Sequence, residues 1–312
     1  MSTYLVTGGA GFIGSHLCDR LLAEGKRVVA VDDLSGGRIA NLVESRAYGQ
    51  QFTFYNVDIR AEGLVTIFER HQPEVVVHLA ARRGDRGAPD PMADASVGVL
   101  GLLNVLECAV ATGARKAVYA STAAVYGDQR RLPAKESVIG SSRPLTPAAI
   151  AAKLAADYLR FYERYRGIEQ TALVLGSVYG PRQAADEGRG VVGVMAAKML
   201  SGEQPVIFGD GNQTRDFVFL DDAVHAFSLA ADRGAGRVIN IGTSVETSVN
   251  GVFRMLAEIV GYRGQPVFGP PGVGEVRRSL LDNELAEREL GWKPWTHLED
   301  GLAETVAAMR HG

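Results

Sequence analysis

Three closely spaced glycines near the N-terminus constrain the fold of this chain more than any other feature. Residues 7–14 read TGGAGFIG, and the three glycines with the spacing of the motif are Gly8, Gly11 and Gly14. They follow an apolar segment of strand length, Tyr4–Thr7, and precede a helical pattern that begins at Phe12. Glycines at this spacing allow a tight turn, let a pyrophosphate approach the backbone and let the helix pack closely on a sheet. Because the free N–H groups of a first helical turn, here at Phe12 and Ile13, attract anions, the motif predicts a dinucleotide-binding site.

An acidic pair, Asp32 and Asp33, follows the next apolar segment, about 20 residues after the glycine motif. A carboxylate at this place accepts hydrogen bonds from the ribose 2′-OH of NAD and repels the additional phosphate of NADP. The position of Asp32 therefore predicts NAD as the cofactor.

The first half of the chain alternates apolar runs of strand length with longer amphipathic segments, as βαβ units do. The predicted strands are Tyr4–Thr7, Arg27–Val31, Phe52–Val57, Val75–Leu79, Lys116–Ala120 and Thr171–Leu175. The predicted helices are Phe12–Glu24, Ala61–Arg70, Pro91–Ala111 and Pro147–Arg166. The strands are almost entirely apolar, which is typical of a sheet covered on both faces. We predict an α/β fold, with a Rossmann-type, doubly wound parallel sheet over residues 1–176.

The pattern becomes irregular after Gly180, with loops predicted at Arg182–Gly190 and Glu203–Arg215. Helices are predicted at Leu220–Ala231, Val249–Val260, Asp282–Leu290 and Leu298–Met309. A short strand, Val238–Ile241, is expected to return to the main sheet as part of a segment near residues 216–243. Residues 177–312 otherwise predict a smaller α/β domain that binds the substrate.

The composition favours a small-molecule partner. Lys and Arg number 33 against 36 Asp and Glu, so the net charge of -3 gives no excess positive field for nucleic acid. Cys18 and Cys108 cannot form a disulfide framework, which fits a reducing cytoplasm. No apolar run reaches the roughly 18 to 20 residues that span a bilayer, so we expect no membrane association. The six histidines are scattered, and their spacing predicts no metal site.

Several longer motifs carry a resemblance to a known family. They are DDLSGG at 32–37, VDIR at 57–60, HLAA at 78–81, STAAVYG at 121–127, VYGPRQ at 178–183, FGDGNQTRDFVFLDD at 208–222 and ELGWKP at 289–294. Over essentially its whole length the chain resembles the extended short-chain dehydrogenases/reductases that act on nucleotide sugars, the epimerase/dehydratase family. Within that family it is most similar to the UDP-galactose 4-epimerase group.

The resemblance implies roles for particular residues of the cofactor site. Asp58 and Ile59 would hold the adenine, and Lys153 would bond the nicotinamide ribose. The remaining implied cofactor contacts are Gly8, Gly11, Phe12, Ile13, Gly14, Asp32, Asp33, Ser35, Leu79, Ala80 and Ala81.

The resemblance also implies a substrate site for a nucleotide sugar, with UDP as the expected nucleotide. Thr122 matches the catalytic Ser/Thr of the family, and Arg215 matches an arginine that contacts the nucleotide diphosphate, a role that suits a guanidinium fork. Ser177 stands where an Asn commonly faces the substrate phosphates. Arg86 lies in an arginine-containing loop, 81–91, at the expected substrate mouth, where an acidic sugar such as a uronate is one possible ligand.

The catalytic tyrosine of the family is replaced. It should lie four residues before Lys153, one helical turn away, and this position is Ala149. Alanine cannot accept a proton from the sugar hydroxyl. Gly98 and Val174 also depart from the family pattern. Three explanations stay open: a tyrosine removed by engineering, a natural variant that uses another base, or a catalytically silent binding protein.

Some side chains that could replace the tyrosine as the catalytic base also have a purely structural interpretation. Tyr126 is expected to serve packing, and His78, at the end of an apolar strand, is expected to be a core histidine. Lys153 could act as a base only if its pKa fell strongly beside the positive nicotinamide.

Alanines at 123 and 124 occupy the positions where related dehydratases and decarboxylases carry carboxylates, so the resemblance implies epimerisation. In that reaction hydride leaves the sugar C4 for NAD and returns to the other face. The first hypothesis is an NAD-dependent UDP-hexose 4-epimerase, with a UDP-uronate 4-epimerase as a variant. The second is a non-catalytic binder of NAD or a nucleotide sugar. Family members pair the helices expected at Pro91–Ala111 and Pro147–Arg166 into a four-helix bundle, which implies a homodimer.

Overall fold

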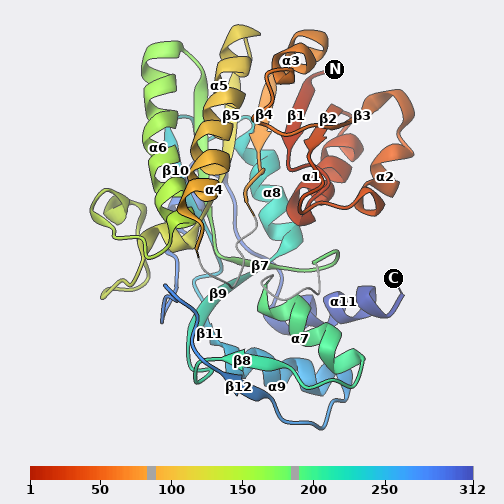
Figure 1. Cartoon of the computed structure of the whole chain (residues 1–312), viewed down its shortest axis with the longest axis vertical. Helices are drawn as coiled ribbons and strands as arrows, with labels where there is room; N and C mark the ends of the chain where they lie inside the picture. The colour runs from red at the N-terminus through yellow and green to blue at the C-terminus, as the bar shows by residue number, and fades with distance from the viewer. Residues whose placement is uncertain (83–88, 184–189, 312) are drawn as a thin grey trace.

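A parallel β-sheet forms the centre of the larger lobe of the computed structural model, which describes residues 1–82, 89–183 and 190–311 (Figure 1). Within those ranges the sheet has seven strands in the order β10-β6-β5-β4-β1-β2-β3. They are β1 (Thr3–Thr7), β2 (Arg27–Asp32), β3 (Phe52–Asn56), β4 (Val75–His78), β5 (Lys116–Thr122), β6 (Glu169–Leu175) and β10 (Arg237–Ile241). The order reverses between β1 and β4, and ligands bind at such a reversal, beyond the carboxyl ends of the strands.

Helices cover both faces of this sheet. One face carries α1 (Phe12–Ala23) and α8 (Leu220–Ala230), and the other carries α3 (Leu64–His71), α5 (Leu102–Ala111) and α6 (Pro147–Arg166). Successive side chains of a strand point to opposite faces, so Tyr4 and Val6 join the core under α1 whereas Leu5 joins the core under α5. The predicted doubly wound α/β fold is confirmed.

Shorter helical segments complete the larger lobe. They are η1 (Ile39–Leu42), α2 (Val43–Arg46), η2 (Gly49–Gln51), η4 (Ala123–Tyr126), η5 (Glu136–Ser141) and α10 (Glu284–Leu290). The last of these packs on β10, so the chain returns to the larger lobe late in the sequence.

The smaller lobe contains elements that the sequence pattern did not predict. Its strands are β7 (Ser177–Tyr179), β8 (Val206–Phe208), β9 (Thr214–Phe219), β11 (Glu246–Ser248) and β12 (Val267–Gly269). Its helices are α7 (Val191–Leu200), α9 (Val249–Val260) and α11 (Leu298–His311), and α7 had not been predicted. Strands of three residues show too little periodicity to be read from sequence.

Between β9 and β10 the chain passes from the smaller lobe back to the larger lobe. The strand β9 pairs with β7 and β11 in the small sheet, whereas β10 pairs in parallel with β6 in the main sheet, as predicted for Val238–Ile241. The crossing lies at α8, which packs against α1 of the larger lobe. The return to the main sheet therefore begins after Phe219.

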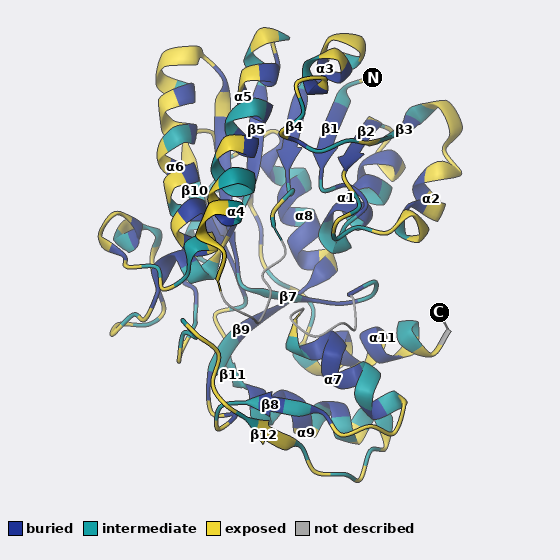
Figure 2. Ribbon diagram, in the orientation of Figure 1, coloured by how far each residue is buried: buried dark blue, intermediate teal, exposed yellow. Residues whose placement is uncertain are grey.

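Residues 91–111 form one continuous helical segment composed of α4 (Pro91–Ala95), the π-helical η3 (Ser96–Gly101) and α5. Among the described residues it is the one helix long and apolar enough to cross a membrane. Its inner side packs on the sheet and on α3, and a Cβ at Gly101 would collide with Ile59. The residues of this inner side, among them Leu102, Val105 and Leu106, belong to the core of the larger lobe, and Figure 2 shows exposed residues on the outer side of the segment.

One buried carboxylate connects β9 of the smaller lobe to the chain that follows β10. Asp216 of β9 is fully buried and accepts hydrogen bonds from Thr243 N (2.7 Å), Thr243 Oγ1 (2.8 Å), Ser244 N (3.1 Å) and Leu281 N (3.2 Å). These donors come from two segments that are distant in the sequence. Asp216 therefore fixes the loop after β10 against β9.

We expect Asp216→Ala to lower the free energy of unfolding by about 3 kcal/mol or more, since each buried donor left without a partner costs about 1–3 kcal/mol. Urea unfolding of both proteins measures this difference. The control is Asp157→Ala, which breaks an exposed pair with Arg160 and should cost no more than about 1 kcal/mol. Equal midpoints for the two variants would contradict the role given to Asp216.

Candidate active site between the two lobes

The glycine motif forms the turn from β1 into α1. Gly8 has a positive φ of 70°, a conformation that side chains disfavour, and its N–H donates to Val31 O at 2.8 Å. A Cβ at Gly14 would collide with the carbonyl oxygen of Gly8. Both glycines are therefore required for α1 to begin directly above the end of β1.

A cavity of about 660 Å³ opens at this turn. Eleven residues predicted to contact the cofactor line it, namely Gly8, Gly11, Phe12, Asp32, Asp33, Ser35, Asp58, Ile59, Leu79, Ala80 and Ala81. Ile13, Gly14 and Lys153, which were also predicted, are not among the described residues of its wall. The roles of all these residues stay predictions.

The wall also contains residues that the sequence reading missed, among them Gly37, Arg60, Arg82 and Val97. Gly37 carried a signal, because it is the last glycine of the DDLSGG motif. A Cβ there would lie close to Asp32 Oδ1 and to Ala10. Val97 carried none, since it reaches the cavity only through the packing of η3.

The acidic residues of this cavity are held by fixed donors. Asp32 is 7% exposed, and its carboxylate accepts hydrogen bonds from Ala10 N (3.0 Å) and Leu34 N (2.8 Å). Burial raises the pKa of Asp32, and the backbone donors oppose this shift. Asp58 pairs with Arg60 at 2.5 Å, a contact that lowers the pKa of the Asp58 carboxyl. The two carboxylates are thus oriented before any ligand arrives.

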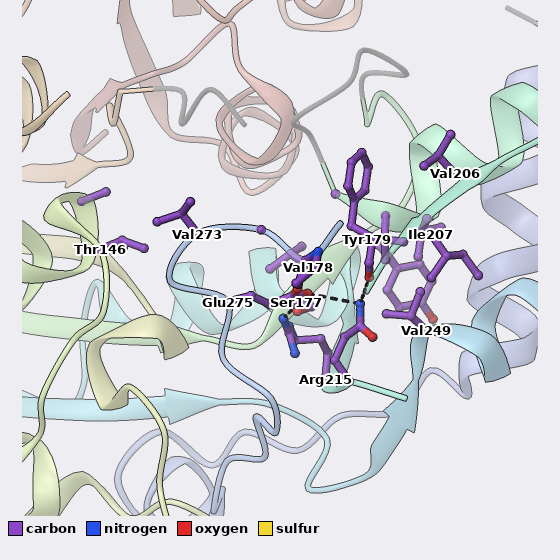
Figure 3. Close-up of a pocket in the computed structure, with 18 of the residues that line it drawn as sticks. Thr146, Ser177, Val178, Tyr179, Val206, Ile207, Arg215, Val249, Val273 and Glu275 are labelled. Carbon is purple, nitrogen blue, oxygen red and sulfur yellow. Dashed lines mark hydrogen bonds and ion pairs between the residues drawn. The ribbon is translucent and has the colours of Figure 1, made fainter. Parts of the chain in front are cut away.

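A second cavity, also about 660 Å³, lies between the lobes. Figure 3 shows Ser177 and Arg215 on its wall, together with Thr146 from the start of α6 and Glu275. The apolar residues of the wall are Pro89, Pro147, Ala148, Val178, Val191, Val192, Val206, Ile207, Phe208, Phe217, Val249, Pro270, Pro271 and Val273. Ser177 and Arg215 had been predicted from the sequence as substrate contacts, whereas the others had not.

Arg215 is the charged centre of this second cavity. Its guanidinium donates to Thr214 O at 2.7 Å and pairs with Glu275 Oε1 at 3.4 Å (Figure 3). Gln213 Nε2 donates to the same carboxylate oxygen at 3.2 Å. Burial lowers the pKa of Arg215, and Glu275 opposes this shift, but a guanidinium remains charged. A cation beside apolar walls suits an anionic group attached to a less polar ring.

The two cavities share part of their walls. Arg82, Gln183 and Gly190 line both. Arg82 pairs with Asp94 of α4 at 3.2 Å, and Asp94 also lines the cavity between the lobes. Arg86, the predicted contact for an acidic sugar, lies outside the described residues. Ligands in the two cavities would therefore be neighbours.

Two of the three predicted catalytic side chains contact the backbone, and the third is buried. Thr122, at the end of β5, accepts a hydrogen bond from Ala124 N at 3.2 Å. Lys153 Nζ donates to Ser142 O at 2.8 Å and to Gly140 O at 3.3 Å. Ala149 is buried in the first turn of α6. Thr122, Ala149 and Lys153 are not among the described residues that line either cavity, so their catalytic roles stay predictions.

Tyr126 and His78 occupy structural positions, as expected. Tyr126 is buried, its hydroxyl donates to Asn240 Oδ1 at 2.6 Å, and burial raises its pKa well above the ordinary value. His78 shares a hydrogen bond of 2.8 Å with Thr7 Oγ1 and stacks on Tyr119. Burial lowers the pKa of His78 to about 4. Over residues 1–82, 89–183 and 190–311, no cluster of three or more His, Cys, Asp or Glu side chains could hold a metal ion.

Known proteins with similar sequences and structures match this chain along its length. Residues 4–242 match the NAD dependent epimerase/dehydratase family. A UDP-glucose 4-epimerase of Mycolicibacterium smegmatis is 42% identical over an alignment that covers 98% of each chain. Two solved structures each cover 99% of both chains. The UDP-glucose 4-epimerase of Thermotoga maritima with UDP-glucose is 40% identical with a TM-score of 0.92, and that of Thermus thermophilus with NAD is 33% identical with a TM-score of 0.90. This chain is therefore a member of the NAD-dependent epimerase/dehydratase family.

Proposed function

We propose that this chain is a UDP-hexose 4-epimerase that works with bound NAD. The observation that carries the proposal is the common wall of the two cavities, to which Arg82, Gln183 and Gly190 belong. Hydride transfer needs the cofactor and the sugar side by side, and a common wall provides this. The similarity to UDP-glucose 4-epimerases over 98% of the chain supports the choice of substrate.

The residues of the first cavity fit NAD. The turn at Gly8 and the close approach at Gly14 leave the N–H groups of α1 open to a pyrophosphate. Asp32 presents a fixed carboxylate to a ribose diol, and the same charge opposes a 2′-phosphate. Bound NAD would supply a reversible hydride acceptor for the sugar C4, which is the chemistry that inversion at this carbon requires.

The residues of the second cavity fit a nucleoside diphosphate. Arg215 would bind the diphosphate, which would replace or share its contact with Glu275. The apolar wall that includes Ile207 and Val249 would contact the less polar parts of the nucleotide. Ser177 would add a hydroxyl donor on the same wall.

The proton of the sugar hydroxyl needs an acceptor, and Ala149 provides none. Thr122 and Lys153 are the nearest counterparts of the family's catalytic groups. Two of the three Lys153 donors are directed at Ser142 O and Gly140 O, which fixes the ammonium near the start of α6. If neither group moves the proton, the chain binds NAD and a UDP-sugar without catalysis. This is the second candidate function, and the absence of a proton acceptor at Ala149 favours it.

A uronate is an alternative substrate for the same reaction. Arg82 lines the cavity between the lobes, and a guanidinium there can bind a sugar carboxylate beside its pair with Asp94. A uronate should therefore be assayed beside neutral hexoses.

We also propose that the protein is a cytoplasmic homodimer. Cys18 and Cys108 are free thiols, which suits a reducing compartment. Exposed apolar side chains lie on η3 and α6, namely Leu100, Ile150, Leu154, Phe161 and Tyr165. Those on α6 are spaced by 4, 7 and 4 residues, which places them on one helical stripe. Exposed stretches on α5 and α6 are visible in Figure 2, and pairing of these helices with a second copy would cover the stripe.

The cofactor proposal predicts that the purified protein retains NAD and that Gly14→Ala loses it, because the new Cβ would push α1 away from the Gly8 carbonyl. Denaturation followed by chromatography measures the released nucleotide. Gly63→Ala is the control, since a Cβ there meets nothing within 4 Å. Recovery of NADP alone would contradict the role given to Asp32.

The missing-base account predicts that Ala149→Tyr increases epimerisation about 10²- to 10⁴-fold, the gain expected from a positioned general base. Both proteins are incubated with UDP-glucose, UDP-N-acetylglucosamine and UDP-glucuronate, and the C4 epimers are separated by chromatography. Asp157→Tyr is the control, because it places the same ring on an exposed position of α6 that lines neither cavity and should give no gain.

Two outcomes would overturn that account. If the Ala149→Tyr protein holds NAD and is inactive on all three substrates, more than the base is missing. If the unaltered protein turns over equally fast, another residue is the base, and Thr122 and Lys153 should be removed next.

The dimer proposal predicts that Phe161→Glu produces a monomer, because a charge in the middle of the apolar stripe cannot be buried without a partner. Sedimentation velocity at micromolar concentration measures this. The control is Val43→Glu, which changes an exposed apolar residue on α2, outside the stripe, and should remain dimeric. A monomeric unaltered protein would refute the proposal.

A further inference from the structure

The loop after β7 contains a residue in an unusual backbone conformation. Arg182 has a positive φ of 62°, which is uncommon for a residue other than glycine and costs free energy. It stands between Pro181 and Gln183, at the point where the chain passes from the small sheet towards α7. Such a conformation persists only when contacts on both sides of the residue maintain it.

The side chain of Arg182 reaches across to the cofactor lobe. Its guanidinium pairs with Asp19 at 2.7 Å and donates to Ser15 Oγ at 3.2 Å, and both partners belong to α1. A second nitrogen lies 3.3 Å from Glu44 of α2. The side chains of Arg182 and Asp19 are 19% and 17% exposed, so this pair is largely shielded from solvent.

A neighbouring contact holds the same loop to the same helix. His16 Nε2 lies 3.1 Å from the carbonyl oxygen of Pro181. Burial, with Arg182 nearby, lowers the pKa of His16 to about 4, so this imidazole is neutral near pH 7 and can donate to that carbonyl. Two successive residues of the loop are therefore attached to α1, whose first turn borders the cofactor cavity.

The next residue, Gln183, faces the substrate lobe. It is 8% exposed, its Nε2 donates to Val178 O at 3.1 Å, and its Oε1 accepts from Gly193 N at 3.0 Å. Gly193 lies in the first turn of α7, and Val191 and Val192 of that turn line the substrate cavity. Gln183 also lines both cavities.

We propose that Arg182 is a positioning residue that couples the cofactor helix α1 to the substrate cavity. Arg182 fixes the loop on α1, and Gln183 carries that fixed position to the start of α7 and to the common wall of the two cavities. The inference rests on the proposed function, because it assigns the two cavities to NAD and to a UDP-sugar. Arg182 lines neither of these two cavities, so its effect on UDP binding is exerted through Asp19 and Gln183.

The test measures UDP binding to the NAD-loaded protein by isothermal titration calorimetry. Arg182→Gln is expected to weaken UDP binding at least about fivefold, the lower end of measured couplings between sites. Asp19→Asn is expected to weaken it by a similar factor. Because the two residues act through one contact, the double variant should bind UDP no more weakly than the single variant that has the lower affinity. Arg182→Lys keeps the charge without the fork and should recover part of the affinity.

The control is Arg20→Gln, on the same helix, which breaks the exposed pair of Arg20 with Glu24 and should leave UDP affinity unchanged. Bound NAD is measured in every variant. The inference is overturned if Arg182→Gln retains NAD and binds UDP as the unaltered protein does, even when its melting temperature falls. It is also overturned if the losses of the two single variants add. An unaltered protein that holds NAD and does not bind UDP refutes the proposed function, and this inference with it.

Discussion

The contact between Gly14 and the carbonyl of Gly8 is the constraint on which the rest of the site depends. Without a side chain at either position, α1 begins directly above the end of β1. That placement leaves the N–H groups of the first turn open to an anion. It also brings Ala10 N onto the Asp32 carboxylate, so the turn and the acidic end of β2 hold each other in place.

The same helix, α1, also contacts the loop that leads into the smaller lobe. Its Ser15 and Asp19 receive Arg182, and the adjacent Gln183 holds the start of α7. Gln183 also lines both cavities, so the contact with α1 is one residue away from their common wall. Two lobes joined only by flexible linkers would not hold two ligands at a fixed separation. The buried Asp216 fixes the other connection between the lobes, where β9 meets the loop after β10.

The residues proposed for binding and those proposed for proton transfer have different surroundings. The groups suited to holding NAD and a diphosphate, such as Asp32 and Arg215, stand on cavity walls with fixed partners. At the position that the resemblance assigns to proton transfer the chain has Ala149, and the other two positions that it assigns to catalysis, Thr122 and Lys153, contact backbone atoms. Under the proposed function, affinity for the substrate would depend on the first set, and the rate of the chemical step would depend on the second. Retention of the cofactor therefore says nothing about turnover.

The sequence by itself determined the doubly wound sheet and the dinucleotide motif, because both depend on short-range patterns. Apolar strands that alternate with helices and the spacing of Gly8, Gly11 and Gly14 can be read within a few tens of residues. The strands β7, β8 and β12 could not, because three-residue strands are specified by partners far along the chain. The pairing of Arg182 with Asp19 joins residues 163 positions apart, and the contacts of Lys153 depend on how η5 folds against α6. Only the tertiary structure decided these features, since their energies come from contacts between side chains and backbone that no local pattern records.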